Sequence, residues 1–420
     1  MGQNTPNRHR FHRAQGAATL SACLFVTLAG TAQSPAPRTN SAASDLDRCR
    51  VHRITGFPGS HQFASDFIET LATDPADPDS ETIYGLTADL TDVVPFNDRA
   101  MYISRSTNGG ETWTEVARIP NNYFDAALGE GIFNGLVVSP GADYFIVTTQ
   151  RGAFQIFPPT SAASTRIIPI PGPRVPYTPP KVRIAKQPGD PVRANVAAMT
   201  PDGEHLIIGY GYFDLDPKLF SYHTDQSGSW IEDGFIPAPP TEMDLISMQF
   251  DNPAKTNPDF LYLGTGDQVY LLNRRTRRWS RVEGVGPDSA IHGMSVVGGL
   301  HLAACWGIYN PIGPGMVRRV TTDSFLLHRS TDEAGSNIRA YSIDIDPDQP
   351  GREAVASLTG VYTSKDGGRT WTRINDLPDE EFRTVHFNSD GTLLVSGIAG
   401  TFLTNPFSPA CSPHLKLRHK

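Results

Sequence analysis

Two octapeptides of the chain are nearly identical: Ser106-Thr107-Asn108-Gly109-Gly110-Glu111-Thr112-Trp113 and Ser364-Lys365-Asp366-Gly367-Gly368-Arg369-Thr370-Trp371. In each, an Asn or Asp side chain can accept hydrogen bonds from nearby backbone N–H groups, while glycine adopts a conformation that other residues avoid. The tryptophan then packs beneath the turn. We therefore predict two tight turns between strands, formed by Ser106, Asn108, Gly110 and Trp113 and by Ser364, Asp366, Gly368 and Trp371. Degenerate copies end at Trp230, five residues after Asp225, and at Trp279.

A second pattern repeats along the whole chain. Alternating apolar stretches typical of strands flank turns rich in Asp, Pro and Gly, at intervals of roughly 45 to 65 residues. These turns begin near Asp74, Pro140, Pro201, Asp251, Gly298, Asp346 and Asp390. Seven units of about four short strands each predict an all-β, seven-bladed β-propeller.

The position of each blade follows from this repeat. The inner strands are predicted near 62–73, 131–139, 192–200, 242–250, 290–297, 337–345 and 382–388. The last unit lacks an outer strand, whereas residues 50–57 form a strand that precedes the first unit. We therefore predict that this N-terminal strand pairs into the last blade and closes the ring. The proline-rich residues 158–191 are expected to form an extended loop that either covers one mouth or only bridges two blades.

The composition is that of a folded domain, and the net charge disfavours some classes of partner. The 420 residues include 38 Gly and 35 Pro, which argues against a helical bundle, and 39% hydrophobic residues supply a core. The net charge of −8 disfavours general binding to nucleic acid or anionic membranes. No sequence motif predicts a cofactor or a metal site, and we expect a monomer.

The N-terminus has the features of an export signal. Arg8, Arg10 and Arg13 precede an apolar run from Ala17 to Ala29, and small residues follow at 30–32. We predict a signal peptide at 1–32, a polar linker at 33–48, the propeller at 49–412 and a basic tail at 413–420, in a secreted or periplasmic protein. A membrane anchor is the alternative, although the run is short of the ~20 residues needed. A lipid on Cys23, which follows Leu20-Ser21-Ala22, is another.

The cysteines bear on how the ring closes. Cys49 and Cys411 flank the predicted propeller, and an exported protein can keep a disulfide there. Closure of the ring would bring the two together, so we predict a disulfide at this position. Two unpaired thiols are the alternative. Cys305, within an apolar stretch, is expected to be a buried strand residue, with a reactive thiol as the alternative.

The two octapeptides resemble Asp-box (BNR-like) repeats, which occur in sialidases, xyloglucan-cleaving glycosidases, sortilin-type receptors and a photosystem II assembly factor. The resemblance implies a propeller, but those proteins include hydrolases, receptors and assembly factors, so it does not choose a function. Sialidases also carry an Arg-Ile-Pro motif before the first box. Here Arg118-Ile119-Pro120 follows the box, which departs from the sialidase pattern.

Candidate site residues lie where the inner strands begin, because these ends surround the channel mouth. Arg193, Arg339 and Arg383, with Asn134, are candidates for binding a ligand, since converging guanidinium groups bind carboxylate or sulfate. Each arginine could instead pair with a neighbouring carboxylate. For catalysis, Asp66 with Glu69 or Asp244 could supply the two carboxylates of a glycosidase. His292 could act as a general base or could be bonded within the fold. Asn195, at the entry of the third inner strand, is a further polar candidate.

Two further charged stretches have alternative interpretations. Arg274-Arg275-Thr276-Arg277-Arg278 could contact a polyanion or could be a charged sheet edge, which the position favours. Asp344, Asp346 and Asp348 alternate like calcium ligands, but no calcium-loop pattern follows, which favours a turn.

The sequence thus predicts an exported propeller that binds an extracellular ligand, a glycan or a protein, at its channel mouth. An anionic glycan fits the arginines best. The alternative is a glycan-cleaving enzyme, a sialidase-like hydrolase or a polysaccharide lyase, that uses the same mouth.

Overall fold

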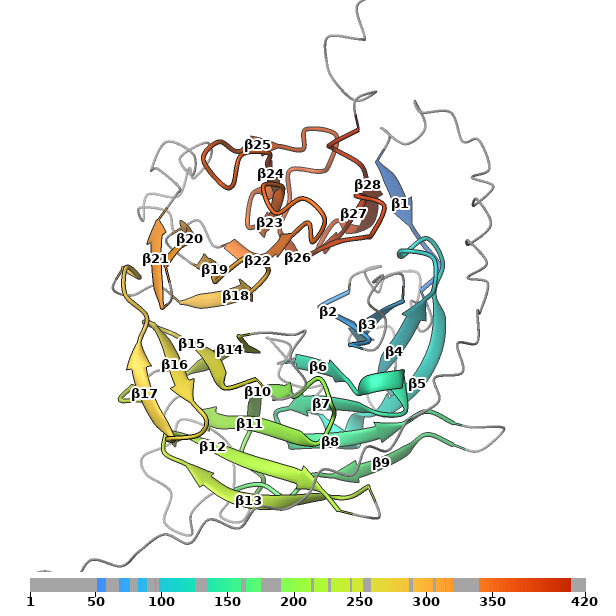
Figure 1. Ribbon diagram of the computed structural model, residues 1–420. Helices are drawn as coiled ribbons and strands as arrows, with labels where there is room; N and C mark the ends of the chain where they lie inside the picture. The colour runs from blue at the N-terminus through green and yellow to red at the C-terminus, as the bar shows by residue number, and fades with distance from the viewer. Residues whose placement is uncertain are drawn as a thin grey trace, which may run out of the picture. The chain divides into compact units, whose positions relative to one another are not determined.

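The computed structural model describes residues 51–57, 68–75, 82–88, 95, 98–124, 135–159, 164–174, 190–212, 215–225, 228–241, 244–251, 258–286, 290–304, 307–313, 315–319 and 340–408. These residues form seven four-stranded antiparallel sheets. Each sheet is one blade of a propeller, and the innermost strands β2, β6, β10, β14, β18, β22 and β26 face the centre (Figure 1). The prediction of a seven-bladed, all-β propeller is confirmed.

The strands of each blade follow one another from the centre outwards. Blades one to three consist of β2 (Thr70–Thr73), β3 (Ile83–Ala88), β4 (Ala100–Ser106) and β5 (Thr114–Pro120); β6 (Gly135–Val138), β7 (Phe145–Thr149), β8 (Gly152–Phe157) and β9 (Arg166–Pro169); and β10 (Ala194–Met199), β11 (His205–Tyr212), β12 (Leu215–Thr224) and β13 (Trp230–Ile236). Two short 3-10 helices, η3 (Asn121–Tyr123) and η4 (Pro140–Ala142), lie in blades one and two.

Blades four to seven repeat this order. They consist of β14 (Leu245–Phe250), β15 (Phe260–Thr265), β16 (Val269–Asn273) and β17 (Arg278–Arg281); β18 (Ile291–Ser295), β19 (His301–Ala304), β20 (Gly307–Gly313) and β21 (Met316–Arg319); β22 (Ala340–Ile345), β23 (Glu353–Ser357), β24 (Gly360–Ser364) and β25 (Thr372–Arg373); and β26 (Phe382–Phe387), β27 (Leu393–Gly397), β28 (Gly400–Thr404) and β1 (His52–Ile54). Every inner strand lies within its predicted range. One expectation was wrong, because β9, an outer strand, lies inside the segment 158–191 predicted to be only a loop.

The N-terminal strand closes the ring as predicted. β1 pairs antiparallel with β28, with Ile54 opposite Thr401 and His52 opposite Leu403. Behind this pairing, Ile54 and Phe57 are buried in one apolar cluster with Trp113 and Leu394, residues of the first and last blades. Head and tail of the propeller are therefore held together by a shared sheet and a shared core.

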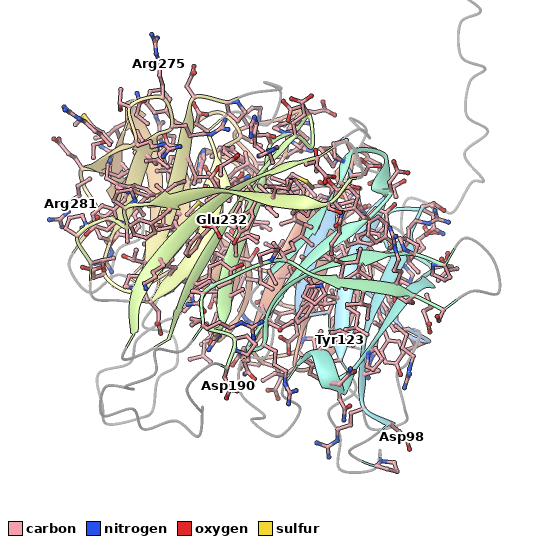
Figure 2. The ribbon with its side chains drawn as sticks, turned by 90° about the horizontal axis from the view of Figure 1, so that it is seen from below. Asp98, Tyr123, Asp190, Glu232, Arg275 and Arg281 are labelled. Carbon is pink, nitrogen blue, oxygen red and sulfur yellow. The ribbon has the colours of Figure 1, made fainter. Side chains whose placement is uncertain are left out.

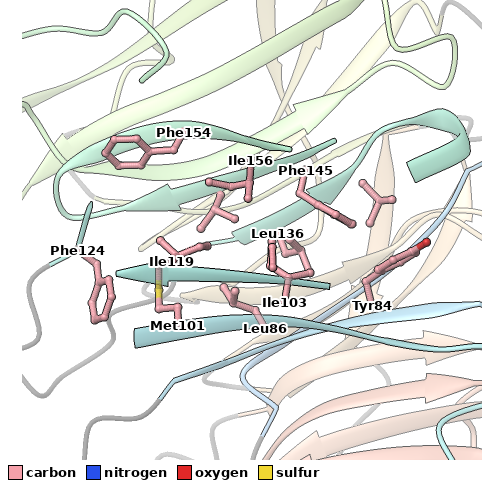
Figure 3. Close-up of a cluster of buried hydrophobic side chains, with 13 residues drawn as sticks. Tyr84, Leu86, Met101, Ile103, Ile119, Phe124, Leu136, Phe145, Phe154 and Ile156 are labelled. Atoms are coloured by element: carbon pink, nitrogen blue, oxygen red, sulfur yellow. The ribbon is translucent and has the colours of Figure 1, made fainter. Parts of the chain in front are cut away.

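Apolar side chains between neighbouring blades form the core. Figure 3 shows the cluster between blades one and two, where Leu86 and Ile103 meet Leu136, Phe145 and Ile156. Phe145 is completely buried. Burying a side chain of this size stabilises the fold by roughly 1.5 to 3 kcal/mol. Since the interface recurs around the ring, the blades keep one another in place.

The first octapeptide forms a closed turn between β4 and β5. The Ser106 hydroxyl donates to Asn108 Oδ1 at 2.9 Å and accepts the Gly110 N–H at 2.8 Å. Asn108 Oδ1 also accepts the Thr112 N–H at 3.0 Å. The Trp113 indole N–H donates to the Gly110 carbonyl at 2.9 Å, so the ring is fastened beneath the turn.

The second octapeptide, between β24 and β25, repeats this pattern bond for bond. The Ser364 hydroxyl donates to Asp366 Oδ1 and accepts the Gly368 N–H, both at 2.9 Å. The Trp371 indole N–H donates to the Gly368 carbonyl at 2.9 Å. The backbone and side-chain bonds from Thr370 lower the pKa of Asp366. Trp279 differs, because its indole N–H donates to the Pro237 carbonyl outside any such turn.

Both octapeptides also connect their blade to the preceding one. The Asn388 amide of blade seven donates to the Gly109 carbonyl at 2.8 Å, and the Asn310 amide of blade five donates to the equivalent Gly367 carbonyl at 2.9 Å. Gly368 has a φ of +73°, and a Cβ there would lie 2.5 Å from the Asn310 amide nitrogen. The glycine is therefore required both for the turn and for the close approach of the neighbouring blade.

Candidate functional site

The channel mouth is lined by residues at the start of the inner strands. A cavity of about 350 Å³ at this end is lined by Glu69, Thr70, Arg193, Asn195, Asp244, Leu245, Ile246, His292, Tyr341 and Arg383. These residues come from blades one, three, four, five, six and seven. Because every inner strand starts at the same face, residues far apart in sequence meet in one place.

A β-bulge in five consecutive blades directs these side chains. The inner strands β10, β14, β18, β22 and β26 each skip one residue in their register with the second strand. The skipped residues are Asn195, Ile246, His292, Tyr341 and Arg383, and all five line the cavity. A bulge adds one residue to a strand and re-aims its side chain, which is why bulges often accompany binding sites.

Small residues make room for these bulges. After each bulge the register resumes opposite Gly209, Gly264, Ala303, Ala356 or Ser396. At Gly264 a Cβ would lie 2.3 Å from Ser247 Oγ and 2.8 Å from Ile291 Cβ. A larger residue on the second strand would therefore clash with the bulged inner strand or with the next blade.

The arginines of the mouth lie beside carboxylates. Arg383 donates from Nε to Glu381 Oε1 at 2.6 Å. Burial raises the pKa of Glu69 to about 7, and the positive charge of Arg383 opposes that rise. Burial likewise raises the pKa of Asp244, opposed by the charge of Arg193. Arg383 is therefore paired with a neighbouring carboxylate, as the alternative interpretation expects. For Arg193, the nearby carboxylate is that of Asp244, whose pKa its charge lowers.

Two rings complete the wall of the mouth. The ring centroids of His292 and Tyr341 are 5.4 Å apart, at an interplanar angle of 58°. The guanidinium carbon of Arg383 lies 5.8 Å from the Tyr341 ring centroid, within the range of a cation–π contact. The mouth therefore combines flat apolar surfaces with charged groups.

The channel continues inward as a second cavity of about 440 Å³, which shares Glu69, His292, Tyr341 and Arg383 with the mouth. Its inner part includes Met248, Met294, Asp344 and His386. Asp344 Oδ2 accepts the Phe387 N–H at 2.8 Å and lies 3.2 Å from His386 Nδ1. Asp344 is thus engaged with blade seven.

The turn interpretation fits Asp346 and Asp348, whereas Asp344 lies on strand β22. Asp346 Oδ1 accepts the N–H groups of Asp348 and Gln349, both at 3.0 Å. Within the described ranges, no group of three or more His, Cys, Asp or Glu side chains could hold a metal ion. In the same part of the chain, no helix is long and apolar enough to span a membrane.

The structure brings together those predicted residues that it describes. Arg193, Asp244, His292 and Arg383 line the mouth together with Glu69 and Asn195. The structure does not describe Asp66, Asn134, Arg339, Cys49, Cys305 or Cys411, nor the predicted signal, linker and tail. Sequence reasoning missed Tyr341. It is the second residue of its inner strand, as His292 and Arg383 are of theirs, and this shared position could have indicated it.

This chain is similar in sequence to a xyloglucanase. No family sequence profile matches it. A xyloglucanase of Paenibacillus sp. is 24% identical over 385 residues, covering 86% of this chain and 31% of the relative. The chain thus spans about a third of that relative's length.

The similar solved structures share the fold. The GH74 xyloglucanase of Xanthomonas campestris matches with a TM-score of 0.51 and 14% identity, over 85% of this chain and 53% of that one. PorZ, a surface component of the type-IX secretion system of Porphyromonas gingivalis, matches with a TM-score of 0.51 and 17% identity, over 83% and 47%. The extracellular domain of a putative hybrid two-component system of B. thetaiotaomicron matches with a TM-score of 0.51 and 11% identity, over 85% and 39%.

Proposed function

We propose that this protein binds a glycan at the channel mouth. The observation that supports this is the convergence of Glu69, Arg193, Asp244, His292, Tyr341 and Arg383 from six blades on one cavity of about 350 Å³. That volume falls within the ~300 to 1,000 Å³ of small-molecule sites. Sugar hydroxyls both donate and accept hydrogen bonds, so neighbouring arginine and carboxylate groups suit them. The Tyr341 ring offers a flat apolar surface to a sugar face.

The arginines make an acidic sugar the preferred ligand. Arg383 and Arg193 can each form two parallel bonds to a carboxylate or sulfate group. Such a group would compete with Glu381, which holds Arg383 at 2.6 Å. A neutral sugar would instead bond to the arginine and carboxylate groups together. Binding of the acidic ligand should therefore weaken with salt much more than binding of a neutral one.

Cleavage of the glycan is the second candidate function. A carboxyl group with a pKa of about 7, as at Glu69, is half protonated at neutral pH and can donate a proton to a glycosidic oxygen. Asp244 on the same cavity would then act as base or nucleophile. In a lyase, an arginine would bind the sugar carboxylate and His292 would remove the proton on the adjacent carbon. A double bond would then form as the C–O bond to the neighbouring sugar breaks, and the Tyr341 hydroxyl would protonate the departing oxygen. The xyloglucanase names of two similar proteins support a glycan ligand for either function.

We also propose that the protein acts outside the cytoplasm, after removal of residues 1–32. The extracellular-domain neighbour supports this location. A disulfide between Cys49 and Cys411 is part of the same proposal, since β1 starts at His52 and its partner β28 ends at Thr404. Mass spectrometry of the non-reduced protein tests the cleavage and the disulfide, because it identifies the mature N-terminus and any pair of peptides linked through Cys49 and Cys411.

A panel of neutral and acidic oligosaccharides tests the function of the mouth. Retention on immobilised protein and release of reducing or unsaturated ends are measured for the wild type and for Tyr341→Ala, Arg383→Ala and Glu69→Gln. The control is Arg275→Ala, an exposed guanidinium on the outer hairpin of blade four (Figure 2). Retention lost in Tyr341→Ala but kept in Arg275→Ala supports binding. Release lost in Glu69→Gln supports cleavage, and equal retention by all variants refutes a site at the mouth.

A further inference from the structure

A separate cavity of about 400 Å³ lies at the end of blade six that is remote from the mouth, lined by Gln349, Gly351, Arg352, Lys365 and Phe407. Ile345 pairs with Glu353, and Glu353 pairs with Ser364, so the residues that follow Ile345 and Ser364 lie at the same edge of the blade. Tyr341, at the other end of β22, belongs to the mouth. At ~3.3 Å per residue the two ends of this strand are roughly 17 Å apart.

Hydrogen bonds fix the frame of this cavity. Besides the bonds that Asp346 accepts, the Arg352 N–H donates to the Gln349 carbonyl at 2.7 Å. The Gly367 N–H donates to the Gly351 carbonyl at 2.9 Å, which ties the turn between β22 and β23 to the octapeptide after β24. The two segments that line the cavity are therefore fixed relative to each other.

Two cations approach one aromatic ring in the cavity. The Arg352 guanidinium carbon lies 5.1 Å, and Lys365 Nζ 5.7 Å, from the centroid of the Phe407 ring. That ring is itself stacked on Phe387, at a centroid distance of 5.8 Å. Each cation is attracted to the ring, but the two repel each other.

The local carboxylates form an ion pair with only one of the two cations. Asp346 Oδ2 lies 3.5 Å from Arg352 Nη1 and compensates that guanidinium in part. Asp366 is next to Lys365 in sequence, but its carboxylate accepts the N–H and hydroxyl of Thr370. Among the described residues, no ion pair within 4.0 Å involves Lys365. The Lys365 ammonium is thus left without an ion-pair partner among the described residues.

We propose that this cavity binds an oxyanion, the carboxylate or sulfate group of a small ligand, between Lys365 and Arg352. The anion accepts from Lys365 Nζ and from guanidinium N–H groups that Asp346 does not use, and the Gln349 amide supplies a further donor. Its negative charge removes the repulsion between the two cations. The site lies at the opposite end of the blade from the mouth and does not depend on the function proposed there.

Calorimetric titration of the full chain tests this site at constant ionic strength, with chloride as the replaced anion. One arm uses inorganic sulfate and the other sodium glucuronate, which distinguishes a free inorganic ion from an acidic sugar. The variants are Lys365→Ala and Lys365→Glu, and Lys218→Ala removes an exposed lysine of blade three as a matched control. Thermal unfolding of each variant shows that the propeller is intact.

We expect saturable binding of at least one anion by the wild type and by Lys218→Ala. Loss of one charge-assisted bond should weaken it about tenfold in Lys365→Ala, and Lys365→Glu should abolish it. Arg383→Ala at the mouth should bind as the wild type does. Binding of neither anion by the wild type, or equal affinity in Lys365→Ala, would overturn the proposal. So would binding that is lost in Arg383→Ala and kept in Lys365→Ala, since the anion would then lie at the mouth.

Discussion

Replacing Glu353 by glutamine should make the propeller more stable at pH 8 and remove part of its pH dependence. Glu353 lies on β23 with a side chain that is 0% exposed, between blades five and six. Burial raises its pKa to about 7; the bond from Asn310, at 2.7 Å to Oε1, opposes the rise, and the charge of Asp366 adds to it. Among the described residues, Oε2 accepts no hydrogen bond.

The nearby histidine does not compensate this charge. His301 Nδ1 lies 3.8 Å from Glu353 Oε1. Burial lowers the pKa of His301 to about 4, although bonds to Asn310 and to the Val297 backbone oppose the shift. At neutral pH this histidine is therefore uncharged, and no other cation among the residues that the structure describes forms an ion pair with Glu353.

The size of the effect follows from the two pKa values of Glu353. Below pH 4.5 both the folded and the unfolded chain are protonated at this position, so burial of the acid costs nothing extra. As the pH rises from 4.5 to 7, the unfolded chain loses this proton first, and the free energy of unfolding falls. Above pH 7 the full cost is present, about 3 kcal/mol for a shift from 4.5 to about 7.

Glutamine cannot ionise and keeps an oxygen that can accept the Asn310 bond. The free energy of unfolding of Glu353→Gln minus that of the wild type should thus be about 3 kcal/mol larger at pH 8 than at pH 4. Comparing the two pH values cancels any packing cost of the amide. In thermal unfolding this corresponds to roughly 4 °C.

Urea unfolding of both proteins at pH 4, 5, 6, 7 and 8 measures the difference. Glu204→Gln, an exposed glutamate on blade three, is the control and should show no such trend. If the difference between Glu353→Gln and the wild type were the same at pH 4 and pH 8, burial would not perturb Glu353 and the reasoning would be refuted.

Three further predictions concern stability. Phe145→Ala should lower the free energy of unfolding by about 3 to 5 kcal/mol, because the ring is fully buried between blades one and two; chemical denaturation measures this, and a loss below ~1 kcal/mol would contradict the packing described. Ile54→Ala should lower the free energy of unfolding by about 2 kcal/mol or more, because Ile54 anchors the closing strand. Amide hydrogen exchange should then become faster in β28 than in β15, and equal exchange in both strands would argue against closure there. Ser364→Ala should lower the free energy of unfolding by about 1 to 3 kcal/mol, because the buried Gly368 N–H loses its acceptor. Thermal unfolding of Ser364→Ala and of the equivalent Ser106→Ala should show similar losses.

The fold was readable from the sequence because its determinants are local. Alternating apolar residues, turns such as the one after Ile345, and the two octapeptides each specify a hairpin through bonds within a few residues, and seven repetitions of one hairpin pattern specify a propeller. The closing strand was also predictable, since the last repeat lacked an outer strand and the strand at residues 50–57 preceded the first repeat without a blade of its own. The two octapeptides make the same hydrogen bonds as each other, and their relation to Asp-boxes stays a resemblance in sequence.

The site was only partly readable. Inner-strand starts pointed to Arg193, Asp244, His292 and Arg383, because topology alone places those ends at one mouth. Tyr341 was missed, since a bulge depends on a small residue such as Ala356 on the adjoining strand, and one strand's pattern does not show which residue its register skips.

The sequence by itself determined the seven repeats, the strands within them and the turns that join them, since these depend on residues close in the chain. Only the tertiary structure decided which side chains enter the channel, that Arg383 lies against Glu381, and that Lys365 and Arg352 share one ring. The physical reason is that burial, pKa and charge balance depend on neighbours from other blades. Those neighbours are fixed only when the ring closes.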